Sequence, residues 1–313
     1  MSESAEDAST SKTASTRVSA VFACWPPGPL EREKRSSTSA SGSTTERVTR
    51  IDSACMAAIL LDVDGVLHVS GEPIPGAVEA VARLRAVGHR LRFVTNNSTR
   101  SRAALAEELR GMGLVLDDDE LQTTPVAAAQ RLGGRRVYAL VMSAIVPDLA
   151  EIELVGEGAD AVLLGGCDET TEPNQVFSHM NLARAFSEIQ AGADLFCLHK
   201  NPWWQTARGP MLDGGAFVAA LEYATGVEAT VLGKPSAACF AAALAALDAE
   251  PELTWMVTDD LDQDVRGAQL FGMKTLLLRT GKFRPEQLER SPTIPDAVLS
   301  SIAHVPDWID RSL

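Results

Sequence analysis

The sequence predicts an α/β protein with a doubly wound, mostly parallel sheet, and three observations lead to this class. Short apolar runs without polar alternation, such as residues 57–62, are typical of parallel strands buried on both faces. Helical patterns separate these runs, as in βαβ units. The chain has 313 residues, of which 45% are hydrophobic and 22% charged, enough for about two globular domains.

The first series of elements runs from residue 57 to residue 132. Pro75 suits the first turn of a helix and Gly88 suits its end, and Ser98 or Thr99 is an acceptable N-cap for the next helix. We therefore expect strands over 57–62 and 91–95, and helices over 75–87, 99–109 and 126–132.

The pattern then restarts. A second series of strands is expected over 137–146, 161–164 and 195–198, and a third over 230–232, 255–258 and 275–278. The helices expected between them cover 181–190, 215–224, 237–247 and 265–271. We find no internal repeat.

Residues 1–55 differ from the rest in composition. They contain 19 Ser or Thr residues and a Pro-rich stretch, without a sustained apolar period. Such a segment is expected to be a disordered tail, because it buries too little apolar surface to offset its chain entropy. Two alternatives stay open, namely that Met56 is the true start and that the tail is regulatory.

Charge and cysteine usage exclude several classes of partner. The net charge of −14 does not suit a phosphate backbone or an anionic lipid surface, so we expect neither nucleic acid nor membrane as a partner. No apolar run approaches the ~18 residues of a membrane span. The five cysteines form no CxxC pair, and no signal-peptide core is present. These features favour a cytoplasmic protein.

Polar side chains follow four of the apolar runs. They are Asp62 and Asp64, Thr95 with Asn96 and Asn97, Lys234, and Asp259 with Asp264. In doubly wound sheets, ligands bind outside the carboxyl ends of the strands. Clustered carboxylates with no His or Cys favour a hard cation, and Mg²⁺ is the natural choice. Mg²⁺ together with a lysine makes a site for a phosphoryl group.

These four motifs resemble those of the haloacid dehalogenase (HAD) superfamily. The stretches 74–77, 93–100 and 219–226 narrow the resemblance to subfamily IIA, the NagD-like phosphatases. Within it, the branch containing phospholysine phosphohistidine inorganic pyrophosphate phosphatase is the most similar. The resemblance implies a Rossmann-like HAD core over 56–133 and 230–313. It also implies an inserted α/β cap of the C2 type over 134–229, because 139 positions separate Thr95 from Lys234.

The resemblance also implies a role for each motif residue. Asp62 would be the nucleophile that forms an aspartyl-phosphate, and Asp64 would be the general acid and base. Thr95 would bind the phosphoryl group through its hydroxyl and Asn96 through its backbone N–H, with Asn97 beside them, and Lys234 would neutralise the charge. Mg²⁺ would be held by Asp62, Asp64, Asp259 and Asp264, the last acting on the metal shell.

Cap residues and partners complete the expectations. Lys200 and Asn201 lie in a stretch that resembles the substrate-facing loop of the family. The substrate is expected to be a small phosphorylated compound, with pyrophosphate and phosphoamino acids implied by the branch. The resemblance also implies a homodimer through the cap, for which the sequence itself shows no interface.

Thr258 departs from the family pattern, which has Gly before the first aspartate of the fourth motif. If this position needs space or a positive φ angle, Asp259 would be misaligned. The alternative to a phosphohydrolase is therefore a catalytically impaired protein that binds phosphate ligands. Transfer of the phosphoryl group to an acceptor other than water is a third reading.

Overall fold

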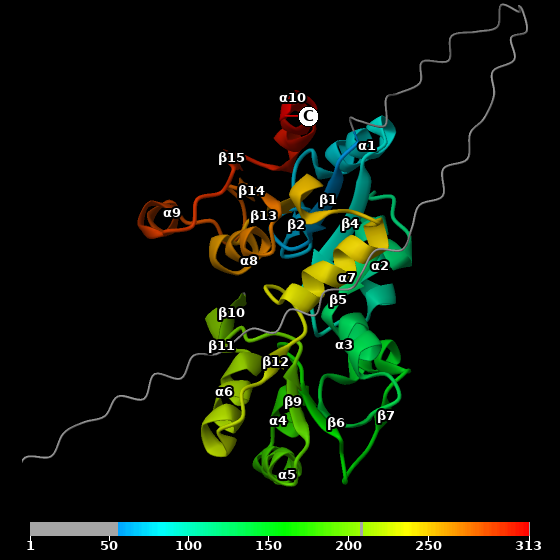
Figure 1. The fold of residues 1–313 in the computed structure, drawn as a ribbon, viewed down its shortest axis with the longest axis vertical. Coiled ribbons are helices and arrows are strands. Elements are labelled where there is room, and N and C mark those ends of the chain that lie inside the picture. The colour runs from blue at the N-terminus through cyan, green and yellow to red at the C-terminus, as the bar shows by residue number, and fades with distance from the viewer. Residues whose placement is uncertain (1–55, 207–208, 313) are drawn as a thin grey trace, which may run out of the picture. The chain divides into compact units, whose positions relative to one another are not determined.

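The computed structural model describes residues 56–206 and 209–312, so the predicted tail over 1–55 lies outside the described residues. Among those described, no helix is long and apolar enough to cross a membrane. Two parallel sheets organise this part of the chain (Figure 1). This arrangement confirms the predicted α/β class.

The first sheet has six parallel strands in a doubly wound order. The order is β15 (Ala297–Leu299), β14 (Lys274–Leu278), β13 (Thr254–Thr258), β1 (Ala58–Asp62), β4 (Arg90–Thr95) and β5 (Leu121–Thr123). The chain leaves β1 toward β4 and β5 and later returns to β13 on the other side. The order therefore reverses between β1 and β13, which is where ligands bind in such sheets.

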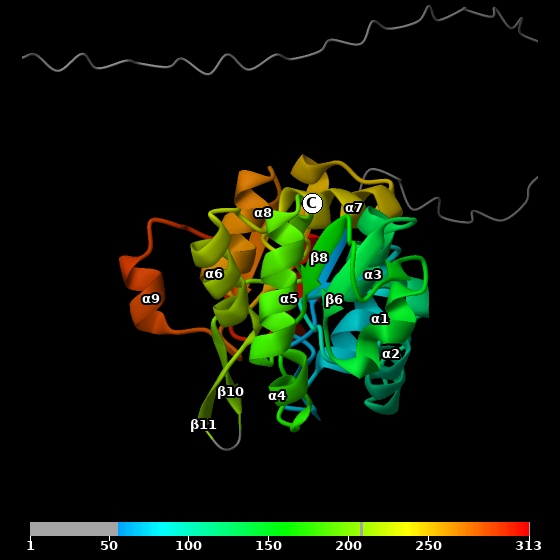
Figure 2. The same ribbon diagram turned by 90° about the horizontal axis from the view of Figure 1, so that it is seen from below.

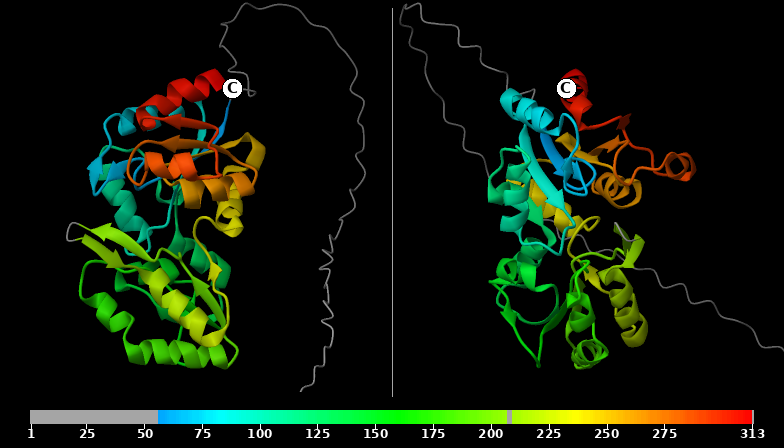
Figure 3. Two further views of the ribbon diagram at one scale, coloured as in Figure 1. Left: turned by 90° about the vertical axis from the view of Figure 1, so that its left-hand side faces the viewer. Right: turned by 180° about the vertical axis from the view of Figure 1, so that it is seen from behind.

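Alternate residues of β1 enter different cores, as expected for a strand covered on both faces. Ile59 and Leu61 pack with α1 (Ala77–Val87), α2 (Arg102–Gly111) and α10 (Val305–Ser312). Figure 3 shows α10, in red, beside α1, in cyan. Leu60 instead packs with α7 (Ala237–Leu247) and α8 (Arg266–Leu270).

The second sheet has five parallel strands. Their order is β12 (Thr230–Val231), β9 (Asp194–Cys197), β8 (Ala161–Leu164), β6 (Arg136–Leu140) and β7 (Glu153–Leu154). The helices α5 (His179–Gln190) and α6 (Gly214–Thr225) lie side by side on one face (Figure 2). The other face packs with α3 (Thr124–Leu132) and the 3₁₀ helix Ser143–Leu149.

Three predicted elements differ from the structure. The strand expected over 137–146 ends at Leu140, and a 3₁₀ helix that contains Pro147 follows it. The strand expected over 230–232 belongs to the second sheet, since Thr230 and Val231 pair with Phe196 and Cys197. The helix expected over 265–271 begins earlier, as a π-helical turn over Leu261–Val265 that continues into α8.

The cap of α2 also differs from the expectation. Ser101, and neither Ser98 nor Thr99, accepts the backbone N–H of Ala104. The reason is local, because the Asn97 side chain first turns the chain by accepting the N–H groups of Thr99 and Arg100. The helix can begin only after that turn.

Short elements complete the described part. Two hairpins are formed by β2 (His68–Val69) with β3 (Glu72–Pro73) and by β10 (Trp203–Thr206) with β11 (Gly209–Leu212). The remaining helices are α4 (Glu172–Val176), α9 (Pro285–Arg290) and the 3₁₀ turns Asp118–Glu120, Pro251–Leu253 and Ile302–His304.

Candidate active site

Asp62 lies at the carboxyl end of β1, next to the point where the strand order reverses. Its carboxylate is buried and lies 2.7 Å from the Nζ atom of Lys234. The same ammonium group lies 2.7 Å from Oδ2 of Asp264. A lysine thus bridges two buried carboxylates, and this is the arrangement in which buried charges are tolerated.

Burial and charge act against each other within this cluster. Burial raises the pKa of Asp62, and Lys234 acts in the opposite direction. Burial also raises the pKa of Asp264, to about 7. For Lys234, burial alone would lower the pKa, but Asp264 and Asp62 outweigh it and raise the pKa above its usual value. The lysine therefore stays charged and offers its ammonium group to an anion.

Lys234 reaches this position from a loop between the two sheets. The loop follows β12 and precedes α7, so the third motif does not follow a strand of the first sheet. The Asn96 side chain holds the loop by accepting the N–H of Lys234 and donating to its carbonyl, both at 2.9 Å. We therefore assign the Asn96 amide to the support of Lys234.

Asp259 follows β13 and has one carboxylate oxygen without a partner. Its Oδ2 accepts the N–H of Lys282 at 2.6 Å, whereas the buried Oδ1 has no hydrogen-bond partner among the described residues. Burial raises the pKa of this carboxyl to about 6. The side chain lies against Gly65 and Gly281, where an added Cβ would approach Oδ2 to 1.9 and 2.0 Å.

This geometry fits a hard cation with few side-chain ligands. No group of three or more His, Cys, Asp or Glu side chains converges as a metal site within 56–206 and 209–312. The unpartnered oxygen of Asp259 and the carboxylate of Asp62 are nevertheless suitable oxygen donors. Asp264 instead binds protein groups, since its Oδ2 accepts hydrogen bonds from the Lys234 ammonium group and the Thr258 hydroxyl.

Asp64 is the exposed carboxylate of the cluster. Its side chain is 58% exposed, and its Oδ2 lies 3.5 Å from the Thr95 hydroxyl. Thr95 is buried at the end of β4 and also accepts the N–H of Asn97. Asp64 and Thr95 thus meet at the edge of the sheet, as the sequence predicts, and Asp64 is free to turn toward a bound molecule.

The predicted cap residues stand apart from this cluster. The Nζ atom of Lys200 lies 2.7 Å from Glu222 of α6, which also accepts the N–H of Ala229. The backbone of Asn201 bonds to His199 and Gly215. The segment nevertheless reaches the second motif, since His199 Nε2 lies 2.8 Å from the Ser98 hydroxyl.

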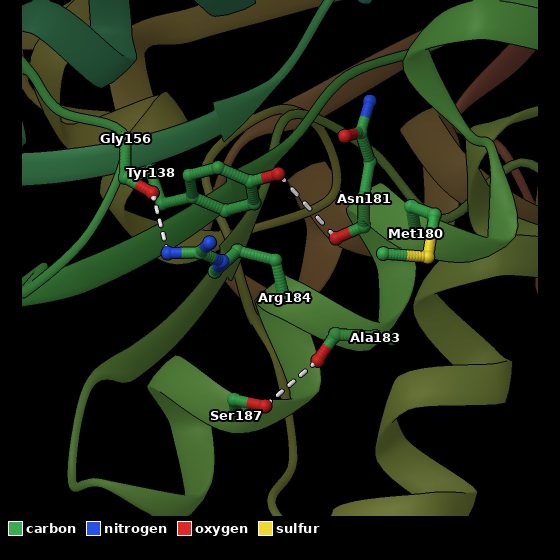
Figure 4. Close-up of a pocket in the computed structure, with 7 residues that line it drawn as sticks. All are labelled: Tyr138, Gly156, Met180, Asn181, Ala183, Arg184 and Ser187. Carbon is green, nitrogen blue, oxygen red and sulfur yellow. Dashed lines mark hydrogen bonds between the residues drawn. The ribbon is translucent and has the colours of Figure 1, made fainter.

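A cavity of about 490 Å³ lies elsewhere, beside β6 and α5 (Figure 4). Its polar groups bond to the chain itself: the Tyr138 hydroxyl to the carbonyl of Asn181, and Arg184 to the carbonyl of Gly156. The strand-end motifs contribute no residue to it. We therefore place the candidate active site at the strand ends.

Thr258 occupies an ordinary strand conformation. It is the last residue of β13 and is fully buried, and the non-glycine residues with positive φ in the described chain are Ser70 and Asp248. Its hydroxyl donates to Asp264 at 2.8 Å and accepts the N–H of Asp260 at 3.1 Å. The position thus needs no glycine conformation, and the hydroxyl braces the residue that holds Lys234.

Lys282 is a site residue that the sequence analysis missed. Its Nζ lies 3.0 Å from Asp260, and its backbone N–H binds Asp259. The surrounding carboxylates raise its pKa against the effect of burial. Residues that bind ligands in such sheets follow the carboxyl ends of strands, and Lys282 lies in the loop that follows β14. The same criterion therefore also applies to Lys282.

Comparisons with known proteins define the class of this fold and site. Residues 59–155 match the family of haloacid dehalogenase-like hydrolases, and residues 231–305 match a HAD-hydrolase-like family. The chain belongs to the haloacid dehalogenase superfamily. Within it, the curated relatives and the similar nitrophenyl phosphatase and NagD structures support the predicted subfamily IIA, the NagD-like phosphatases.

Two curated relatives span most of the chain. Phospholysine phosphohistidine inorganic pyrophosphate phosphatase of Xenopus laevis is 36% identical over 261 residues, covering 80% of this chain and 93% of the relative. Human haloacid dehalogenase-like hydrolase domain-containing protein 2 is 37% identical over 264 residues, covering 83% and 99%. Since the two identities are so close, they do not select one branch.

Two solved structures are similar over the same region. The p-nitrophenyl phosphatase from Archaeoglobus fulgidus has a TM-score of 0.74 and 28% identity, covering 81% of this chain and 99% of that one. A glycerol phosphate phosphatase from Mycobacterium tuberculosis, in complex with magnesium, has a TM-score of 0.69 and 29% identity, covering 79% and 75%. Both are phosphatases, which agrees with the predicted enzyme class.

Proposed function

We propose that the protein is a Mg²⁺-dependent phosphohydrolase that acts through an aspartyl-phosphate on Asp62. The observation that carries the proposal is the buried Asp62 carboxylate held 2.7 Å from the Lys234 ammonium, at the carboxyl end of β1. A fixed carboxylate beside a fixed cation suits nucleophilic attack on a phosphoryl group, whose own charge the lysine offsets.

The remaining motif residues have matching roles. Asp64 is the proposed general acid and base, because its exposed carboxylate can reach the leaving oxygen. The Thr95 hydroxyl would bind a phosphoryl oxygen, and Lys234 would bind another. The Asn97 side chain would stabilise this loop by accepting the N–H groups of Thr99 and Arg100, and would not bind the substrate.

Asp62, Asp259 and the backbone carbonyl of Asp64 would hold Mg²⁺, with Asp264 acting through Lys234. When bound, the metal supplies positive charge that neutralises the phosphoryl oxygens. The unpartnered Oδ1 of Asp259 supports this assignment.

We base the proposed substrate class on the names of the relatives. Their names point to pyrophosphate, phosphoamino acids, glycerol phosphate and p-nitrophenyl phosphate. The second sheet and its helices would form a lid that selects among them, and Lys200 and Asn201 would contribute through the loop that contains them. A cytoplasmic location and a homodimer through this lid also belong to the proposal.

Removing the divalent metal is expected to stop phosphate release. Release of free phosphate is measured from p-nitrophenyl phosphate, pyrophosphate and phosphohistidine. Each substrate is tested with Mg²⁺, with EDTA alone, and with EDTA followed by excess Ca²⁺ or Mg²⁺. We expect a loss of about a hundredfold or more in EDTA and full recovery with Mg²⁺, because uncompensated carboxylates repel an anionic substrate. Equal rates in EDTA and Mg²⁺ would contradict the metal requirement.

Replacing Thr258 by glycine tests the alternative of an impaired phosphate-binding protein. That alternative predicts a gain in turnover. We expect none, together with a loss of about 1–2 kcal/mol in stability, since the hydroxyl bonds are lost and the backbone gains freedom in the unfolded state. Urea denaturation and the same phosphate assay measure both effects. Thr258→Ser, which keeps the hydroxyl, is the matched control and should behave as wild type.

A further inference from the structure

His68 is a buried histidine with one unpartnered ring nitrogen. It begins β2, is 4% exposed, and its Nε2 has no hydrogen-bond partner among the described residues. Its other nitrogen, Nδ1, accepts the backbone N–H of Gly71 at 3.3 Å. A nitrogen that accepts carries no proton, so the neutral ring bears its proton on Nε2. A buried N–H without an acceptor is costly, so this group is ready to donate.

The carboxylate of Asp64 lies close to this N–H. Its Oδ1 lies 3.7 Å from Nε2, just beyond hydrogen-bond distance, while its Oδ2 lies 3.5 Å from the Thr95 hydroxyl. The two residues are also joined through the backbone, since the N–H of Gly65 donates to the carbonyl of His68 at 2.7 Å. The imidazole is therefore fixed beside a carboxylate that is itself exposed and able to turn.

We propose that His68 is the positioning residue of Asp64, donating its Nε2–H to Oδ1 and so placing the acidic proton on Oδ2. This inference rests on the proposed function, in which Asp64 is the general acid. An oxygen that accepts an N–H is the carbonyl-like oxygen of a protonated carboxyl, so the proton resides on the other one. When Thr95 turns its hydroxyl to the phosphoryl group, Oδ2 is left to face the leaving oxygen.

The proton balance of the two steps defines what His68 does. Asp62 forms a bond to phosphorus as the bond to the leaving oxygen breaks, and that oxygen takes its electron pair and the proton of Asp64 Oδ2. In the second step Asp64 takes a proton from the water that attacks phosphorus, and Asp62 is released. His68 neither gains nor loses a proton. It holds one oxygen of Asp64 throughout and stabilises the carboxylate formed in the first step.

A misplaced acid matters only where the leaving group needs a proton. A p-nitrophenolate leaves readily without one, whereas an alkoxide such as that of glycerol does not. His68 should therefore affect the dependence of kcat/KM on the leaving group, because kcat/KM reports the first step, in which the leaving group departs, whereas kcat also contains the second step that all substrates share. A merely structural histidine would lower all rates alike.

The test compares wild type, His68→Phe and His68→Gln on p-nitrophenyl, phenyl and glycerol phosphate. For His68→Phe we expect kcat/KM to fall about tenfold to a hundredfold on glycerol phosphate but less than about threefold on p-nitrophenyl phosphate. His68→Gln retains an N–H at a similar reach and should restore most of the loss. A uniform loss of kcat/KM across the three substrates, or no loss, would overturn the inference while the proposed function stands.

His89 offers a matched control. It is also buried, its Nδ1 accepts the N–H of Ala57 at 3.1 Å, and its unpartnered Nε2 lies 3.9 Å from Asp310. It precedes β4, at the opposite end of that strand from Thr95. His89→Phe should lower stability but leave the leaving-group dependence as in wild type. A steeper dependence in His89→Phe would mean that any loosened core produces the effect, against the inference.

A spectroscopic measurement tests the tautomer of His68 directly. It needs neither catalytic activity nor a folded His68→Phe variant. Long-range ¹H–¹⁵N spectra of the histidine-labelled full chain should show His68 as the Nε2–H tautomer, with an Nε2 shift that moves in Asp64→Asn. An Nδ1–H tautomer would overturn the inference. Wild type that releases no phosphate from any substrate would instead overturn the proposed function, and this inference with it.

Discussion

Asp62→Asn is expected to abolish phosphate release while the fold stays intact. The amide cannot act as a nucleophile, so the loss should reach about a thousandfold or more, as for other covalent catalysts that lose their nucleophile. The amide oxygen can still accept from Lys234 and from the N–H of Val63, which now binds Oδ1 at 2.8 Å. Since burial already disfavours the charge of Asp62, stability should not fall.

The measurement is phosphate release from p-nitrophenyl phosphate, with urea denaturation of the same samples. Asp296→Asn is the control. Asp296 accepts the N–H and the hydroxyl of Thr275 near the start of β14, away from the carboxyl ends of the strands where the candidate site lies. That variant should lose stability but keep its turnover number. Residual activity above about a tenth of wild type in Asp62→Asn would contradict covalent catalysis by this residue.

Lys234→Met is expected to reduce both activity and stability. The variant leaves two buried carboxylates, Asp62 and Asp264, without the cation that lies 2.7 Å from each. Breaking a buried ion pair in this way costs about 3–5 kcal/mol. Activity should fall by about a hundredfold or more, because the phosphoryl oxygens lose a charged partner.

A second substitution separates the two effects. In Lys234→Met combined with Asp264→Asn, one of the two uncompensated charges is removed, so part of the lost stability should return. Activity should not return, since no ammonium group faces the substrate. Urea denaturation and phosphate release report these quantities. A double variant no more stable than Lys234→Met would show that the charge of Asp264 is not the cause.

The class of fold and the strand-end motifs were predictable from local sequence. Parallel strands buried on both faces need uninterrupted apolar runs, and residues 58–62 and 254–258 are both fully buried. Because the carboxyl ends of such strands lie along one edge of the sheet, the sequence alone predicts that Asp62, Thr95 and Asp259 lie close together.

Other features depend on distant pairings that no local pattern encodes. The strand Thr230–Val231 pairs with β9 of the second sheet, although the Lys234 loop that follows it is held by Asn96, which follows β4 of the first sheet and lies 138 positions away. The same holds for the side chains of Asn96 and Asn97. Both side chains form hydrogen bonds to the backbone, of Lys234 and of Arg100 respectively, which no local pattern predicts.

The sequence by itself thus determined which chemical groups this protein has and at which strand ends they occur. Only the tertiary structure decided how each is used: Asp264 beside Lys234, Thr258 bracing Asp264, and His68 facing Asp64. The physical reason is that residue type and spacing set propensity and the available chemistry. Burial, hydrogen-bond saturation and charge compensation arise only when segments far apart in the chain come together.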